Sequence, residues 1–165
     1  MDGFFHRHTK PGTAPGTLSG RAPVVDEALD FTLVEYTQDD VQVLHGVEVD
    51  ECRFHLGTPG HTWIDVAGRP SSEMLRDLGM AFNLHPLALE DVFHANQRSK
   101  LDLYEGQGFI VLNDPVYEDC ELKGRQVSIF FGDNYVISFH DHKADVFKAV
   151  RDRLASVHGL DPARI

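Results

Sequence analysis

The stretch from residue 100 to residue 140 constrains the fold of this chain more than any other part of the sequence. Its candidate strands are residues 100–105, 107–113, 116–122, 125–131 and 135–140. Short turn signals separate them, namely Glu105-Gly106, Asn113-Asp114-Pro115, Lys123-Gly124 and Gly132-Asp133-Asn134. Because consecutive strands joined by so few residues must run in opposite directions, this stretch predicts an antiparallel sheet.

The rest of the chain mixes strands with helices. Residues 29–36 and 62–66 are predicted strands, whereas residues 47–60 give no clear prediction. We expect residues 37–40 to cap a short helix, and the apolar residues of that helix are Val41, Val43 and Leu44.

Three further helices are predicted. Either Ser71 or Ser72 can cap the first helix, which Asn83 ends. A second helix over residues 87–94 follows Pro86, which suits a first helical position. The last covers residues 144–158 and has four apolar residues on one face, namely Val146, Phe147, Val150 and Leu154. The order of elements predicts an α/β (α+β) fold, in which helices sandwich a mixed, largely antiparallel sheet.

Length and charge narrow the possible functions. The 165 residues suit one domain, which we place at 24–165, after a flexible tail rich in Pro and Gly at 1–23. The net charge of −11 makes nucleic acid a poor partner and favours cations. The longest apolar runs fall far short of the ~20 residues of a spanning helix. Cys52 and Cys120 form no recognisable motif, which favours a reducing compartment.

Several segments, in order along the chain, resemble the pattern of CorA-family magnesium channels. The longest segment runs from Asn83 to Val92 and reads Asn-Leu-His-Pro-Leu-Ala-Leu-Glu-Asp-Val. The other segments, all in the same order as in the family, are residues 15–18, 62–66, 97–101, 109–112, 126–130 and 145–154. Ser99 departs from the pattern, because the family usually has proline there. The resemblance extends from Pro15 to about residue 160.

The resemblance implies a place and an assembly for the chain. Family members are homopentamers, in which a cytosolic α/β domain leads into a long stalk helix and two transmembrane helices. The chain would be that cytosolic domain, cut before the stalk, at the cytoplasmic face of the cell inner membrane. It would touch the membrane only through the missing C-terminal helices. Divalent ions bound between neighbouring domains hold these channels shut, and the expected partners are therefore identical copies and divalent cations, not nucleic acid.

Glu90 and Asp91 are the candidate metal-binding residues. Mg²⁺ keeps most of its waters and takes only one or two carboxylates, which suits a site shared between two subunits. Adjacent side chains on a helix diverge by about 100°, so one ion does not engage both residues directly. By resemblance Asp91 is the direct ligand and Glu90 the auxiliary residue, with the opposing aspartate on the stalk beyond Ile165. We expect Mg²⁺ to bind weakly to this chain alone, with Co²⁺ and Zn²⁺ as alternatives.

Other interpretations stay open. The chain could belong to a zinc-transporting relative, or be a free-standing cytosolic module that binds metal or protein. A hydrolase that pairs Asp65 with Asp91 is the third alternative, but we expect no enzyme, because the sequence has no activated nucleophile. Three clusters could suggest zinc: His6 with His8, His140 with His142, and Cys52 with His55 and His61. None has the spacing of a structural zinc site, and we interpret these histidines as surface loop residues.

Overall fold

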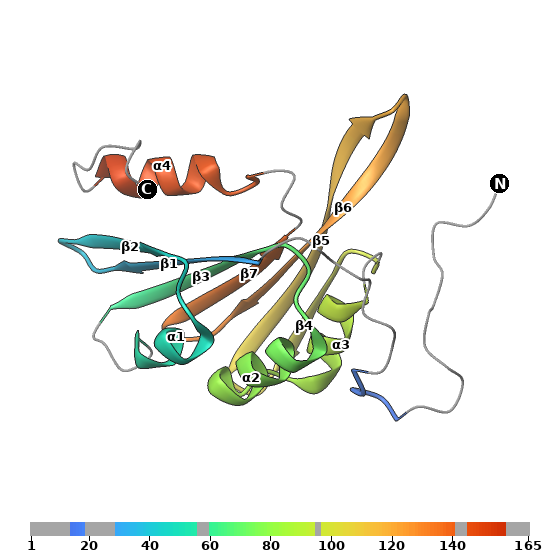
Figure 1. Ribbon diagram of the computed structural model, residues 1–165, viewed down its shortest axis with the longest axis horizontal. Helices are drawn as coiled ribbons and strands as arrows, with labels where there is room; N and C mark the ends of the chain where they lie inside the picture. The colour runs from blue at the N-terminus through green and yellow to red at the C-terminus, as the bar shows by residue number, and fades with distance from the viewer. Residues whose placement is uncertain (1–13, 19–28, 56–59, 95–96, 141–144, 158–165) are drawn as a thin grey trace.

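A computed structural model describes residues 14–18, 29–55, 60–94, 97–140 and 145–157 of the chain. Seven strands form one sheet in the order β2-β1-β3-β7-β6-β5-β4 (Figure 1). The strands are β1 (Asp30–Tyr36), β2 (Val41–His45), β3 (His61–Ala67), β4 (Lys100–Tyr104), β5 (Gln107–Glu118), β6 (Glu121–Phe131) and β7 (Tyr135–His140). The helices are α1 (Val49–His55), α2 (Ser72–Phe82), α3 (Pro86–Phe93) and α4 (Lys148–Val157). The predicted fold class is confirmed.

The sheet is mixed, as the sequence predicted. Between neighbouring strands of the described part, only β3 and β7 are parallel, and the other pairs are antiparallel. A parallel pair needs a long crossover. Here the crossover from β3 to β7 contains α2, α3 and the three strands β4, β5 and β6. β3 and β7 lie near the middle of the sheet, and β3 is buried on both faces.

The predicted helix after residue 40 is wrong. Thr37 and Asp40 instead close a hairpin, because the Thr37 amide donates to the Asp40 carbonyl at 2.8 Å. Val41 and Val43 then pair with Tyr36 and Val34 of β1. A threonine whose hydroxyl accepts from the Asp40 amide at 3.1 Å serves a hairpin turn as well as a helix cap. Pairing with β1 favours the hairpin over the predicted helix.

The two turns predicted at residues 113–115 and 123–124 are also wrong. β5 runs straight through Pro115, which lies opposite Gly124 of β6. The chain reverses instead at Asp119 and Cys120, whose φ angles of 53° and 63° suit a tight hairpin turn. The outer part of this hairpin projects beyond the rest of the sheet in Figure 1. The turn at Glu105-Gly106 between β4 and β5 is as predicted, with a φ of 76° at Gly106.

Helices cover both faces of the sheet. α1, α2 and α3 lie on one face and α4 on the other (Figure 1). The main core lies under α1, α2 and α3 and contains the fully buried Phe109 and Phe130, in contact at 4.5 Å between ring centroids. A smaller cluster of Val34, Val41 and Trp63 packs against Phe147 and Leu154 at α4. The core positions predicted for Trp63 and Phe109 are therefore confirmed.

α4 differs from its prediction in extent and in its buried face. It begins at Lys148, with Val146 and Phe147 in the turn before it. Val150, which we expected on the apolar face, is exposed. None of the helices in the described ranges is long and apolar enough to cross a membrane.

Candidate functional site

Helix α3 carries both predicted metal-binding residues, and its start is held by the residues that the sequence indicated. Pro86 occupies the first turn, and the Nδ1 atom of His85 accepts from the Leu87 amide at 3.3 Å. The His85 ring stacks on Tyr104 with centroids 3.9 Å apart. Ala88 and Leu89 face the core, which leaves Glu90 and the residue after it partly exposed. The helix thus presents its carboxylates at the edge of a rigid core.

Asp91 lies against a lysine of the neighbouring strand. Its Oδ2 atom is 2.7 Å from the Nζ atom of Lys100, which is also 2.7 Å from Oδ2 of Asp102. The Asp91 side chain is 19% exposed and that of Lys100 is 35% exposed. Partial burial works against the charged amine, but hydrogen bonds to Asp102 and Asp91 outweigh it and raise the pKa of Lys100. The candidate ligand therefore already binds a cation of the chain itself.

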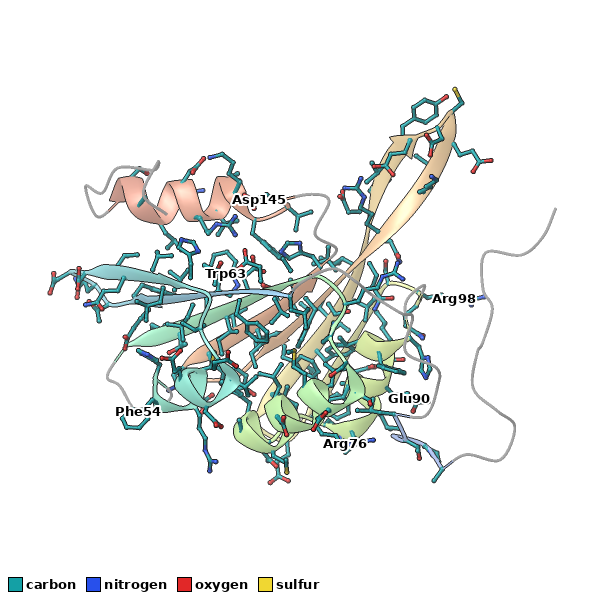
Figure 2. The ribbon with its side chains drawn as sticks, in the orientation of Figure 1. Phe54, Trp63, Arg76, Glu90, Arg98 and Asp145 are labelled. Atoms are coloured by element: carbon teal, nitrogen blue, oxygen red, sulfur yellow. The ribbon has the colours of Figure 1, made fainter. Side chains whose placement is uncertain are left out.

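Glu90 has a different partner. Its Oε2 atom accepts from the backbone amide of Gly16 at 2.8 Å. Figure 2 shows Glu90 beside the segment of residues 14–18, which folds into a turn where the Thr17 amide donates to the Ala14 carbonyl. Gly16 has a φ of +81°, and a Cβ atom there would lie 3.0 Å from Cβ of Pro86. The two carboxylates thus face separate surroundings, as expected for adjacent helical residues. The boundary predicted between tail and domain stays a prediction.

Two glutamines that sequence reasoning missed hold the end of α3. The Gln126 side chain donates to the Asp91 carbonyl at 2.9 Å and accepts from the Gln97 amide at 2.9 Å. Asn113 in turn donates to the Gln97 carbonyl at 3.1 Å and to the Ser99 hydroxyl at 3.2 Å. Gln97 and Gln126 each begin one of the segments that resemble the CorA pattern. Their presence in these segments was the sequence signal that could have indicated a role for both glutamines at the end of α3.

The histidine clusters do not form metal sites in the described residues. His6, His8 and His142 lie outside those residues. The prediction that His140 is a surface loop residue is wrong. His140 is buried in β7, and its Nε2 atom lies 3.1 Å from Oδ2 of Asp65. The correction has a physical reason, since β7 lies inside the sheet and its last four residues are buried.

The residues of the cluster around Cys52 have separate partners. His55 pairs with Glu35 at 3.0 Å, and the exposed His61 stacks on Tyr36 with centroids 5.4 Å apart. Cys52 is buried in the core, and burial raises the pKa of its thiol to about 11.

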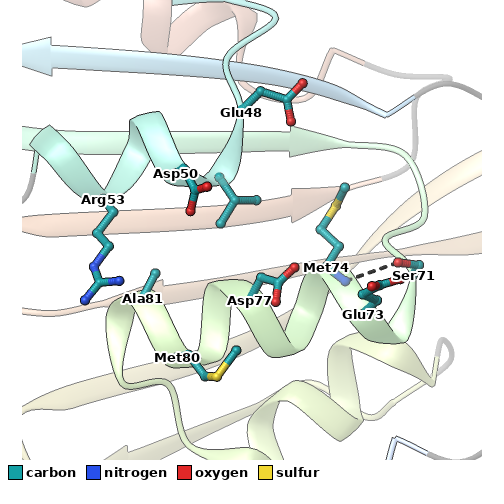
Figure 3. A pocket seen from close by; sticks show the side chains of 10 residues that line it. Glu48, Asp50, Arg53, Ser71, Glu73, Met74, Asp77, Met80 and Ala81 are labelled. Carbon is teal, nitrogen blue, oxygen red and sulfur yellow. Dashed lines mark hydrogen bonds between the residues drawn. The ribbon is translucent and has the colours of Figure 1, made fainter.

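An open groove of about 460 Å³ lies between α1 and α2 (Figure 3). Four carboxylates and one arginine line it, together with methionines and small residues; the charged ones are Glu48, Asp50, Arg53, Glu73 and Asp77. In the described part of the chain, no three His, Cys, Asp or Glu side chains converge closely enough to hold a metal ion. The groove is therefore acidic without being a metal centre, and it is separate from Glu90 and Asp91.

Asp65 and Asp91 do not form the acid–base pair of a hydrolase. Asp65 is buried under α4, where it accepts from the Ser138 hydroxyl at 2.5 Å and from Arg151 at 3.1 Å. Asp91 is on α3, against the opposite face of the sheet (Figure 1). Ser138 points its hydroxyl at Asp65, not at His140, so these three residues do not form a nucleophile and base.

The donors around Asp91 fit a hard divalent cation that keeps its waters. Carboxylate oxygens are the ligands that Mg²⁺ prefers, and it needs only one or two of them from protein. The observation that supports the fit is the ammonium group of Lys100, a cation bound between two carboxylates. That Asp91 is half of a site shared between two subunits stays a prediction.

Comparisons with known proteins agree on one family. The sequence model described as "CorA-like Mg2+ transporter protein" matches residues 59–164. The cobalt/magnesium transport protein CorA of Thermotoga maritima is 30% identical over 155 residues, 92% of this chain and 43% of that protein. The putative metal ion transporter YfjQ of Bacillus subtilis is 40% identical over 94 residues, 56% of this chain and 28% of that protein. The chain thus spans less than half the length of these curated relatives.

Solved structures share the fold. The complete CorA magnesium transporter from Methanocaldococcus jannaschii superposes with a TM-score of 0.56 at 14% identity, covering 79% of this chain and 38% of that one. The soluble domain of CorA from the same organism gives a TM-score of 0.51 at 16% identity, covering 81% and 48%. At these identities the likeness shows the fold alone.

Proposed function

Because this chain belongs to the family of CorA-like Mg²⁺ transporter proteins, we propose that it is the cytosolic regulatory domain of a divalent-cation channel. In this proposal five copies surround the pore at the cytoplasmic face of the cell inner membrane. The domain senses Mg²⁺ and does not catalyse a reaction. One observation supports the sensing role above the others. The Asp91 carboxylate, partly exposed on α3, already binds a positive charge, the ammonium group of Lys100.

The charge of the chain supplies the physical basis for regulation. Each copy has a net charge of −11, so copies packed around one axis repel one another. A divalent cation supplies two positive charges when bound. Asp91 would hold it from one side, and a carboxylate of a neighbouring subunit from the other. A ligand shifts a conformational equilibrium only by its differential affinity for the two states. If only the closed arrangement completes the site, the ion favours closure.

Glu90 supports this site without binding the ion directly. Its carboxylate accepts the Gly16 amide and so holds residues 14–18 against α3. Carboxylates next to a metal ligand are commonly held by such hydrogen bonds. Asp91 is also fixed through its own carbonyl by Gln126, at 2.9 Å. The helix end that carries the ligand is thus anchored from two directions.

The transported ion is proposed to be Mg²⁺, with Co²⁺ second. The name of the Thermotoga maritima relative includes both ions. A zinc-transporting branch gains no support from the described histidines, because His55 faces Glu35 and His140 faces Asp65. The donors around Asp91 are oxygens, which suit Mg²⁺.

The test is Asp91→Ala in the full-length channel. We expect Mg²⁺ to permeate still, while inhibition by cytosolic Mg²⁺ requires a concentration about tenfold higher or more. Flux measured against cytosolic Mg²⁺ reads this out. Asp39→Ala is the matched control, because Asp39 is an exposed carboxylate in the β1–β2 turn and its loss removes the same charge. Unchanged inhibition in Asp91→Ala would show that the regulatory site lies elsewhere.

A further inference from the structure

Lys100 occupies the position in which the proposed sensor would bind its ion. Its Nζ atom lies 2.7 Å from Oδ2 of Asp91 and 2.7 Å from Oδ2 of Asp102. The two carboxylates come from different elements, α3 and β4, and both contact this ammonium group. The Nζ atom also lies 5.9 Å from the centroid of the Phe109 ring, which is part of the buried core. The lysine thus neutralises a pair of carboxylates at the edge of the main core.

An ammonium group and a metal ion cannot occupy the same space. Mg²⁺ holds its ligands at about 2.1 Å, shorter than the 2.7 Å contacts of Lys100, so it would need the room that Nζ now fills. Lys100 has a flexible four-carbon stem, and 35% of its side chain is exposed. Its ammonium group can therefore swing into solvent when a stronger cation arrives. The exchange replaces one positive charge by two.

We propose that Lys100 is a built-in competitor for divalent cations at Asp91, and that Asp102 is a second carboxylate of the same site. This inference rests on the proposed function, and it adds two residues and a mechanism for setting affinity. The site binds an ion only in the fraction of molecules in which Lys100 has left, so the apparent dissociation constant equals the intrinsic one divided by that fraction. A sensor built in this way responds only when free divalent ions are abundant.

The response of stability to Mg²⁺ distinguishes this role from a purely structural one. A structural bridge would tie β4 to α3, and its loss would lower stability at every ion concentration. A competitor behaves differently, because its loss leaves Asp91 and Asp102 repelling each other until a divalent ion joins them. Mg²⁺ should then restore the stability that the substitution removed. If Lys100 is a competitor, its substitution tightens Mg²⁺ binding, and Mg²⁺ restores the lost stability. If Lys100 is only a structural bridge, its substitution lowers stability without tightening Mg²⁺ binding.

The decisive experiment is calorimetric titration of this chain with MgCl₂ at constant ionic strength. Lys100→Met should bind Mg²⁺ at least about tenfold more tightly than the unsubstituted chain. Lys123→Met is the matched control, because Lys123 also pairs with an aspartate, Asp119 at 3.0 Å, but lies near the tip of the β5–β6 hairpin. We expect the control to change the affinity by less than about twofold, since exposed charges far from the site are screened by salt.

Two further variants separate charge from shape and guard against misfolding. Lys100→Arg keeps the positive charge and should keep the weak affinity, whereas Lys100→Gln removes the charge and should tighten binding. Thermal melting with and without Mg²⁺ provides a readout that does not depend on transport. The melting temperature of Lys100→Met should rise with Mg²⁺ several degrees more than that of the unsubstituted chain.

The site is assigned by double variants. Adding either Asp91→Asn or Asp102→Asn to Lys100→Met should return the affinity to the weak value. Unchanged affinity in both Lys100→Met and Lys100→Gln would overturn the proposal, and so would tight binding that survives the loss of Asp102. Failure here leaves the proposed function standing if Asp91→Ala still relieves Mg²⁺ inhibition. Conversely, tighter Mg²⁺ binding by Lys100→Met, together with normal Mg²⁺ inhibition in Asp91→Ala, would contradict the regulatory function and leave the competitor role of Lys100 standing.

Discussion

The two faces of the sheet are held to their helices in different ways. On the face under α1, α2 and α3 the contacts are mainly apolar, and the cluster there includes fully buried residues of the central strands. On the other face α4 meets a small apolar cluster around Trp63 and a buried polar network around Asp65. Figure 2 places Trp63 on the sheet face below α4 and Asp145 beside the start of that helix. One face thus relies on apolar area, and the other adds directed polar contacts.

The polar network links α4 to four strand residues, namely Trp63, Asp65, Ser138 and His140. Arg151 donates to Asp65 at 3.1 Å and also pairs with Asp145. Asp65 accepts from Ser138, whose oxygen accepts from the Trp63 indole at 2.9 Å. A buried charge is costly unless it is paired, so this network tolerates few alternative positions of the helix. An apolar contact tolerates more alternative positions of a helix, because the hydrophobic effect is non-directional. The comparison teaches that a buried charge positions α4, whereas α1 and α2 are held mainly by apolar area.

The largest expected effect comes from emptying the apolar face. Phe130→Ala removes a fully buried ring that contacts Phe109 and Phe139, and it should lower the free energy of unfolding by about 3–5 kcal/mol. Urea denaturation measures this. Phe54→Ala is the control, since the Phe54 side chain is 87% exposed and its loss should change stability by less than about 0.5 kcal/mol. Similar losses in both variants would contradict the assignment of the main core.

Breaking the polar face should cost somewhat less. Arg151→Met leaves the Asp65 carboxylate without its cation, and loss of one partner of a buried pair costs about 3 kcal/mol. Arg153→Met, an exposed position on the same helix, should be nearly neutral. If charge positions α4, the double variant Asp65→Asn with Arg151→Met should lose less stability than the two single losses combined. Additive losses would show that the pair is not coupled.

The smallest effect concerns a polar group at the edge of the apolar face. Ser71→Ala removes the hydroxyl that accepts from the Met74 amide at 3.2 Å, and it should cost about 1 kcal/mol. Ser72→Ala, one residue further, should be neutral or slightly stabilising, because alanine favours a helix interior. Circular dichroism during urea denaturation measures both variants. Equal effects would mean that the cap of α2 is not at Ser71.

Local chemistry was enough to predict much of the fold. Pro86 after His85 set the start of α3, and Asn83 adopts the left-handed conformation that ends α2, with a φ of 51°. The turn at Gly106 and the strand positions of β1, β3 and β7 also followed from residues close in sequence. Each of these features depends on one or two neighbouring residues, which is why the sequence alone could indicate them. The family resemblance came from the same kind of short segments.

Tertiary structure decided the features that need distant partners. The contact of Glu90 with Gly16 spans 74 residues, and that of Arg151 with Asp65 spans 86. The sequence by itself determined that Asp91 lies on a short helix with its neighbouring carboxylate turned away. It did not determine that Lys100 would fill the space between Asp91 and Asp102, because that depends on how β4 packs beside α3. Periodicity predicts which residues share a face, but the packing of elements decides which charges meet.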